Sequence, residues 1–344
     1  MRRSSALYAV GVGLLSALFF TAVYVLNRAM AVDGGHWAWT ASLRYFLSLP
    51  LLACVVPFNG GFAPVWRALR AHPLPWLCWS GIGFTLFCVC LTWAAASGPA
   101  WLVAGSFQLT VVAGMLIAPL IYRDARARLP RPALALGSVI VVGVLMLQVG
   151  HFDARLDATA WAALVSVGVA AVLYPLGNRK ILLHLERSGD ELSATQRVFG
   201  MTLASQPFWL AVAAYAGHSA GWPGLPQIVL AGCVALFAGT IATVLFFHAT
   251  GLVRNDATAL GAVEAMQAAE ILFATALGIA FLAEPPPLGL AAAGVVVIIA
   301  GIVGLSLVVA ARAAGNPRAT RARRSDRGRT QRGPRAMPRP PQAE

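Results

Sequence analysis

Two carboxylic acids stand in a long apolar run late in the chain, and their spacing suits the exchange of a proton for a cation. Glu264, Gln267 and Glu270 follow one another at intervals of three residues. Neighbouring members lie about 60° apart around an α-helix, so the three side chains form one polar stripe. An apolar environment favours the neutral form of a carboxyl group, which can then hold either a proton or a cationic group. We therefore expect Glu270 to be a coupling residue in the middle of its helix.

Three more polar side chains interrupt apolar runs: Arg44, Arg197 and Gln108. Arg44 and Arg197 could form an anion-binding or gating pair. The alternative, which we favour, is that they extend to a membrane surface or form an ion pair with Glu264 that holds two helices in register. For Glu264 the choice between this structural pairing and a role in coupling stays open. Gln108 could hydrogen-bond a substrate or bridge two helices.

The elements that must position these residues cannot belong to a soluble protein. Of the 344 residues, 58% are hydrophobic and 11% are charged, whereas soluble chains carry about 25% charged residues. A helix of about 20 apolar residues crosses a bilayer, and ten such runs can be read along the chain. They cover residues 6–28, 37–57, 75–96, 99–121, 132–150, 159–178, 194–215, 226–249, 257–281 and 288–311.

The basic residues predict how these helices are oriented. Lys and Arg gather in the cytoplasmic loops of membrane proteins, and most of the 26 basic residues fall on one side if the N-terminus is cytoplasmic. An even number of spans returns the C-terminus to that side. We predict a multi-pass protein of the plasma (inner) membrane with both termini cytoplasmic. Residues 313–344 are rich in Arg and Pro and are expected to form a disordered cytoplasmic tail.

The two halves of the chain contain similar stretches in the same order. The matches are Tyr24-Val25-Leu26-Asn27-Arg28 with Tyr174-Pro175-Leu176-Gly177-Asn178-Arg179, residues 41–46 with residues 194–199, and Gln108 with Gln267. Because each half holds an odd number of helices, the second copy must be inverted in the membrane. Inverted repeats are typical of secondary transporters. We predict an all-α membrane protein of ten transmembrane helices, arranged as two inverted five-helix repeats over 6–150 and 159–311.

Several of these stretches resemble the drug/metabolite transporter superfamily in its ten-helix, EamA-like form, and within it the multidrug-resistance efflux branch. The resemblance rests on Asn27-Arg28, on residues 34–45 and on residues 263–270, and it covers about 6–311. It implies an inner-membrane exporter of small molecules, such as cationic or lipophilic drugs or metabolites, driven by a proton gradient or by exchange. The runner-up is an exporter or exchanger of amino acids or polar metabolites without proton coupling.

The resemblance has one departure that concerns the coupling residue. The small four-helix multidrug relatives carry their coupling glutamate in the first helix, but the run 6–28 contains no acid. Only Glu264 and Glu270 could replace it.

Other classes of function lack the residues that they would need. The six His are scattered without metal-ligand spacing, the five Cys lie in apolar runs, and there is no phosphate-binding Gly-rich loop. We therefore expect no enzyme, no metal and no cofactor. The expected partners are a small-molecule substrate, a proton or counter-substrate, and the lipid bilayer, with no nucleic acid. Glycines in the fifth and tenth runs suggest close helix packing and a possible homodimer face; they are Gly137, Gly143, Gly294, Gly301 and Gly304.

Overall fold

The computed structural model describes residues 3–96, 98–124, 127, 131–151, 158–253, 263 and 266–314, and every regular element in these ranges is helical. The α-helices are α1 (Arg3–Phe20), α2 (Ala22–Val32), α3 (Trp37–Val55), α4 (Ala63–Ala71), α5 (Pro73–Ser80), α6 (Phe87–Ala94), α7 (Ala100–Phe107), α8 (Leu109–Ile121), α9 (Arg131–His151), α10 (Ala158–Ser188), α11 (Ala194–Ala220), α12 (Leu225–Val234), α13 (Thr243–Val253), α15 (Ala269–Leu282) and α16 (Gly289–Ala314). The shorter elements are η1 (Val56–Asn59), η2 (Gly81–Leu86), η4 (Ala235–Ala242) and η5 (Met266–Ala268).

Eight helical stretches in the described ranges are long and apolar enough to cross a membrane, which confirms the predicted all-α membrane class. They are Leu7–Val32, Trp37–Asn59, Pro73–Ala94, Ala100–Ile121, Arg131–His151, Trp161–Ser188, Leu225–Thr250 and Gly289–Val308. The predicted run 194–215 forms α11, which is long but does not reach the apolar character of these eight. The predicted run 257–281 begins outside the described residues and ends in the shorter apolar stretch Met266–Leu282. Ten spans therefore stay a prediction.

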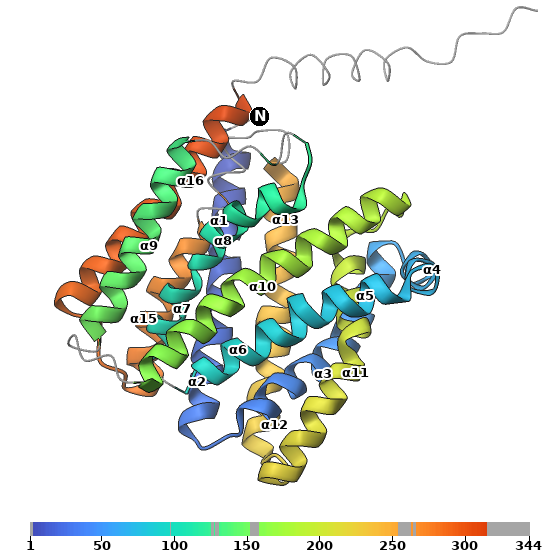
Figure 1. The fold of residues 1–344 in the computed structure, drawn as a ribbon, viewed down its shortest axis with the longest axis horizontal. Helices are drawn as coiled ribbons and strands as arrows, with labels where there is room; N and C mark the ends of the chain where they lie inside the picture. The colour runs from blue at the N-terminus through green and yellow to red at the C-terminus, as the bar shows by residue number, and fades with distance from the viewer. Residues whose placement is uncertain are drawn as a thin grey trace, which may run out of the picture.

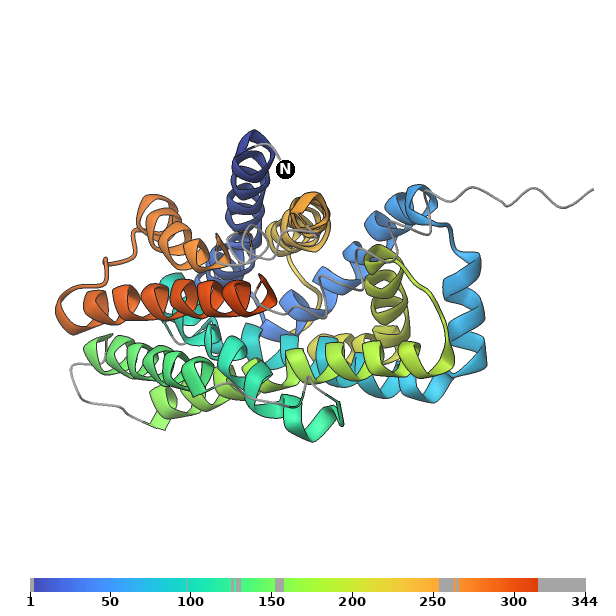
Figure 2. The same ribbon diagram turned by 90° about the horizontal axis from the view of Figure 1, so that it is seen from above.

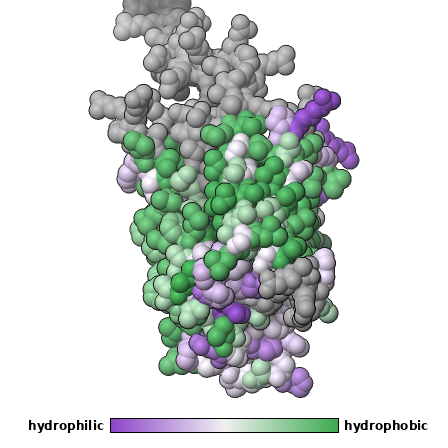
Figure 3. Space-filling view, turned by 90° about the vertical axis from the view of Figure 1, so that its left-hand side faces the viewer, coloured by the Kyte–Doolittle hydropathy of each residue, from purple (hydrophilic) through white to green (hydrophobic). Residues whose placement is uncertain are grey.

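The helices form a bundle in which the described ends of the chain lie at one end. The end of α1 marked N and the C-terminal end of α16 both lie at the top of Figure 1. Figure 2 shows α9 and α16 side by side on one flank, far from α4 and α5 on the other. The flank formed by α9 and α16 carries a broad apolar surface (Figure 3). This surface is what a helix pair needs to face lipid tails.

The glycines of α9 and α16 serve contacts within the chain. The two helices run antiparallel and make the most extensive contact between described helices. A Cβ on Gly143 would lie 2.8 Å from Ile298 Cγ1, and one on Gly294 would lie 2.6 Å from the Leu147 amide nitrogen. The close packing that we expected is therefore present, but it uses up these glycines and they lend no support to a homodimer face.

Several spans are interrupted near their middle. The stretches α5–η2–α6 and α12–η4–α13 each contain a π-helical segment, and Gln108 forms the turn that separates α7 from α8. The 3₁₀ turn η5 directly precedes α15. π-helical segments are frequent at functional sites, and irregular backbone in a membrane is tolerated where it is enclosed by protein or lines a cavity.

One helix was not predicted. The short helix α4 carries exposed Trp66 and exposed Arg67, and the Arg70 guanidinium lies 5.2 Å from the centre of the Trp66 ring. Its aromatic and basic side chains suit the interface between lipid and water.

Candidate functional site

The predicted coupling residue is buried among the helices. Glu270 is 9% exposed and stands in the first turn of α15, just after η5. Tyr24 of α2, which is 5% exposed, interacts with the Glu270 carboxyl as a hydrogen-bond donor. A carboxyl group so enclosed needs either a proton or a polar partner.

A second tyrosine links Glu270 to the two predicted arginines. Tyr174 of α10 interacts electrostatically with Glu270, Arg44 and Arg197, and also with Tyr24. Tyr174 keeps 40% of its surface exposed, and its ring lies 4.9 Å from that of Phe87. The fold thus brings together residues from the two halves that sequence similarity had paired, although the tyrosines had served only as markers of the repeat.

Arg44 and Arg197 have no carboxylate partner among the residues that the structure describes. The Arg44 guanidinium lies 5.6 Å from the centre of the Tyr45 ring and interacts with the Cys88 thiol. Arg44 Nη1 and Arg197 Nε are buried and lack a hydrogen-bond acceptor in these ranges. The expected ion pair of Arg44 or Arg197 with Glu264 stays a prediction, because Glu264 lies outside the described residues.

Arg197 stands at one end of the bundle, where the chain turns from α10 into α11. Ser193 and Gln196 form a capping box at the start of α11, and Gln196 Nε2 donates to the Gly61 carbonyl at 2.9 Å. Arg197 lines a pocket of about 610 Å³ together with acidic and apolar residues of this turn, which include Glu186, Asp190 and Glu191. The capping box therefore fixes the first turn of α11, from which Arg197 contributes to the lining of this pocket.

Gln108 and Gln267 lie at breaks in their helices. Gln108 is buried and donates through Nε2 to the Ala104 carbonyl at 3.3 Å. Gln267 belongs to η5, and its Nε2 is buried without an acceptor among the described residues. Gln267 is therefore the better placed of the two to donate to a ligand.

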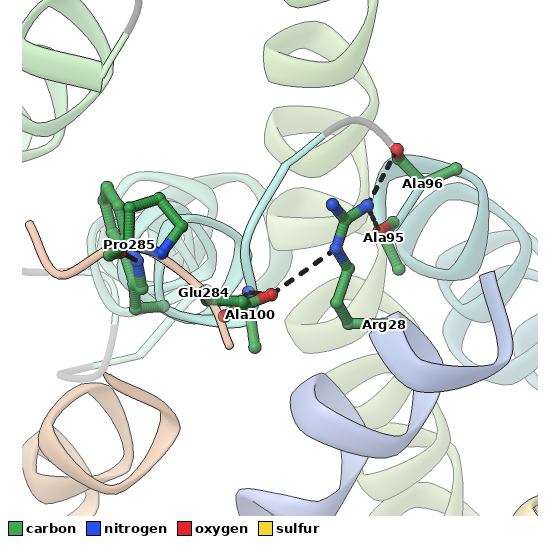
Figure 4. A network of polar contacts seen from close by, with 7 residues as sticks. Arg28, Ala95, Ala96, Ala100, Glu284 and Pro285 are labelled. Carbon is green, nitrogen blue, oxygen red and sulfur yellow. Dashed lines mark hydrogen bonds and ion pairs between the residues drawn. The ribbon is translucent and has the colours of Figure 1, made fainter. Parts of the chain in front are cut away.

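One buried charged network was missed by sequence reasoning. Glu284 is 7% exposed and follows α15 in the loop that leads to α16. Its two carboxylate oxygens accept the backbone N–H of Ala100 at 2.9 and 3.0 Å, at the start of α7. Arg28 Nε and Glu284 Oε1 form an ion pair at 3.4 Å, which is longer than a strong hydrogen bond. Figure 4 shows the Glu284 carboxylate beside Ala100 and facing Arg28 of α2.

The same network reaches a third helix. Arg28 Nη1 donates to the carbonyl oxygens of Ala95 at 3.3 Å and Ala96 at 3.0 Å, just after the end of α6 (Figure 4). Glu284 and Arg28 thus satisfy orphan groups at the start of one helix and the end of another. Burial raises the pKa of Glu284, and the Ala100 amide and Arg28 oppose that rise.

A sequence signal for this network existed. In the predicted topology Arg28 is the last residue at the outward end of one span and Glu284 follows the outward end of another, where few other charges stand. Opposite charges on the sparsely charged side of a membrane protein are candidates for pairing.

The chain is similar to known proteins both in sequence and in fold. Residues 7–311 match the family model described as "Putative multidrug resistance efflux transporter". The Bacillus subtilis (strain 168) protein YjlA is 42% identical over 303 residues, covering 86% of this chain and 93% of the relative. A 42.1 kDa protein of Shouchella clausii is 39% identical over 261 residues, covering 74% of this chain and 68% of the relative. A solved crystal structure shares the fold with a TM-score of 0.54 at 16% identity, covering 90% of this chain and 99% of the other.

Proposed function

The chain belongs to the multidrug resistance efflux transporter family, and from that membership we propose that it is a secondary active transporter that exports small molecules in exchange for protons. The membership confirms the predicted family and supports transport rather than catalysis. The observation that carries the proton-coupled part is Glu270, a carboxyl buried in an apolar bundle with Tyr24 as its polar partner.

The pattern of helix contacts supports the two inverted repeats that such a mechanism uses. Two contacts join a helix to its counterpart in the other half: α9 with α16, and α3 with α11. A third, α7 with α15, joins parts of the corresponding fourth and ninth predicted spans. The contact of α1 with α13 has its counterpart in that of α10 with α6. The π-helical segments η2 and η4 occupy equivalent spans as well. A pseudo-two-fold relation of this kind allows one molecule to open alternately to either side.

Glu270 would couple the two fluxes by holding one cation at a time. With Glu270 ionised and buried, either a proton or a cationic group of the substrate relieves the cost of the bare charge. Binding of one excludes the other, which is the requirement for exchange. Tyr24 stabilises the ionised form by donating to it, so that proton release does not leave the carboxylate without a partner.

The two ends of the bundle suggest how access alternates. At one end the network of Arg28 and Glu284 ties together α2, α6, α7 and the loop after α15. At the other end is the pocket lined by Arg197, near the arginines of α4. By the distribution of basic residues the second end is cytoplasmic, so this arrangement supports a state closed to the outside, with both termini in the cytoplasm.

The test uses purified protein in liposomes that contain a pH-sensitive dye. Three poorly permeant probes are added in turn: ethidium as a cation, phenylalanine as a zwitterion and benzenesulfonate as an anion. Wild type should move protons in response to at least one probe, and Glu270→Gln to none. Asp33→Asn, which neutralises an exposed acid outside the pocket lined by Arg197, is the matched control and should behave like wild type. Proton movement by Glu270→Gln equal to that of wild type would refute the assignment.

A further inference from the structure

The short helix α4 lies across the end of the bundle rather than along it. It joins the candidate span Trp37–Asn59 to the candidate span Pro73–Ala94. Figure 1 shows α4 nearly end-on beside α5, whose axis runs across the view. In Figure 2 it is the light-blue helix at the right-hand edge, crossing the ends of its neighbours. A helix that crosses the ends of two membrane spans lies close to the plane of the membrane surface.

The two faces of α4 differ in their surroundings. Val65 and Ala68 are buried and face the bundle, where α4 contacts α11 and α5. Trp66, Arg67 and Arg70 are exposed on the other face. The apolar face is thus already covered by protein, so the membrane surface meets the aromatic and basic face.

The two arginines of this face are free to bind a ligand. Neither Arg67 nor Arg70 forms an ion pair with a carboxylate of the described part of the chain. The Arg70 guanidinium lies 5.2 Å from the centre of the Trp66 ring, and such a cation–π contact restricts the side chain without using its N–H donors as hydrogen bonds would. Guanidinium groups bind phosphate groups through two parallel hydrogen bonds.

Large apolar side chains flank the same helix and remain exposed. Phe58 is 87% exposed and Phe62 is 43% exposed, both just before α4, and Leu74 just after it is 74% exposed. Exposed apolar side chains beside basic ones are typical of helices that lie between lipid headgroups and acyl chains. The surface therefore combines donors for a phosphate with apolar groups for acyl chains, and a phospholipid carries both partners in one molecule.

We propose that α4 is a binding site for anionic phospholipids of the cytoplasmic leaflet. Arg67 and Arg70 bind the phosphate groups, Trp66 lies at headgroup level, and Phe58 and Phe62 contact the acyl chains. The distribution of basic residues places this end of the bundle in the cytoplasm, and the cytoplasmic leaflet is the one that carries a negative surface potential. The proposal concerns a partner other than the substrate and does not depend on proton coupling.

Lipid bound at α4 should also stabilise the start of α11. Ser193 Oγ donates to the Asn59 carbonyl at 3.0 Å, and Gln196 Nε2 donates to the Gly61 carbonyl at 2.9 Å. These bonds connect the segment before α4 to the capping box of α11. A ligand that holds α4 in place therefore holds this junction as well, and we expect bound lipid to raise the melting temperature.

The test uses the full-length protein in micelles of an uncharged detergent. It is titrated with phosphatidylglycerol, which is anionic, or with phosphatidylcholine, which is zwitterionic. Bound lipid is counted by native mass spectrometry, and the melting temperature is recorded at each step. Wild type should bind phosphatidylglycerol at least about tenfold more tightly than phosphatidylcholine, because each arginine at an anionic surface contributes about fivefold. The double variant Arg67→Gln/Arg70→Gln should lose this preference.

Two further variants separate a defined site from net charge. The matched control Arg123→Gln/Arg187→Gln removes two exposed arginines from the same predicted side of the membrane and should bind like wild type. Arg67→Lys/Arg70→Lys keeps the charge but loses the paired donors, and it should retain part of the preference. All variants keep the Arg-rich residues 313–344, so lipid bound there cancels in the comparison. The melting temperature without lipid shows whether each variant is folded.

Three results would overturn the proposal. The first is phosphatidylglycerol binding to Arg67→Gln/Arg70→Gln as tightly as to wild type. The second is an equal loss of binding in Arg123→Gln/Arg187→Gln, which would show that net charge alone attracts the lipid. The third comes from adding inorganic phosphate: if phosphate alone stabilises wild type and displaces phosphatidylglycerol, the ligand of α4 is a free anion rather than a lipid.

Discussion

The network of Arg28 and Glu284 should behave as one energetically coupled unit, and its strength can be worked out from the structure. Removing one partner from a buried ion pair costs about 3–5 kcal/mol. The Glu284 side chain is 5% exposed but that of Arg28 is 22% exposed, and their atoms are 3.4 Å apart. Water can therefore reach Arg28, and the ion pair is longer than the best charge-assisted bonds at about 2.7–2.9 Å.

These features set the expected effect of each substitution. Glu284→Gln should lower the free energy of unfolding by about 1 kcal/mol, because the amide retains one oxygen for the Ala100 N–H but no longer offers two acceptor oxygens to Ala100 and Arg28. Arg28→Gln should cost about 1 kcal/mol, through the ion pair and the bonds to the carbonyls of Ala95 and Ala96. The double variant should be less unstable than the sum by about 1 kcal/mol.

The assay is thermal unfolding in detergent micelles of wild type, both single variants and the double variant. Each kcal/mol corresponds to roughly 2 °C in a chain of this size. Glu191→Gln serves as the control for loss of an exposed acid. Single effects that add to within about 0.5 kcal/mol would show that the two side chains are not coupled. The reasoning from distance and burial would then be refuted.

Three further predictions follow from particular residues. The pKa of Glu284 is raised in the folded protein, so the unfolded chain releases this proton at a lower pH than the folded chain. Wild-type stability should therefore fall as the pH rises above the ordinary glutamate value of 4.5. The free energy of unfolding, measured across this pH range, should lack this fall in Glu284→Gln. Gly294→Ala should destabilise the protein by about 1–3 kcal/mol, since its Cβ would meet the backbone of Leu147 and Gly143; Gly11→Ala, with open space around it, should melt like wild type. Ser193→Ala should cost about 1 kcal/mol by removing the capping box of α11, and an unchanged melting temperature would contradict this role of the cap.

Much of the fold could be predicted because it depends on local composition. Apolar runs of bilayer length predicted a helix at each of the eight candidate spans in the described part of the chain. The short helix α4 was missed because nine residues of mixed polarity carry no such signal. The segments η2 and η4 were missed because their sequences differ in no obvious way from α-helical neighbours. Their helical type depends on packing rather than on residue preference.

The candidate site was predictable where a residue was costly in lipid. Glu270, Arg44 and Arg197 stood out for this reason, and similarity between the halves paired the two arginines. Tyrosines are common in apolar helices, and only the fold shows that Tyr24 and Tyr174 interact with these charged groups. Glu284 and Arg28 stand just outside the core of their spans, and their contact depends on how distant helix ends meet.

The central claim is that Glu270 couples substrate movement to proton movement, and one comparison tests it most directly. Liposomes with wild type or Glu270→Gln are assayed with whichever of ethidium, phenylalanine and benzenesulfonate wild type transports best. The first measurement is accumulation driven by a pH gradient, and the second is exchange of labelled for unlabelled probe at equal pH. We predict that Glu270→Gln loses at least about 90% of the gradient-driven accumulation, while wild type performs both. Gradient-driven accumulation by Glu270→Gln at the wild-type rate would contradict the account.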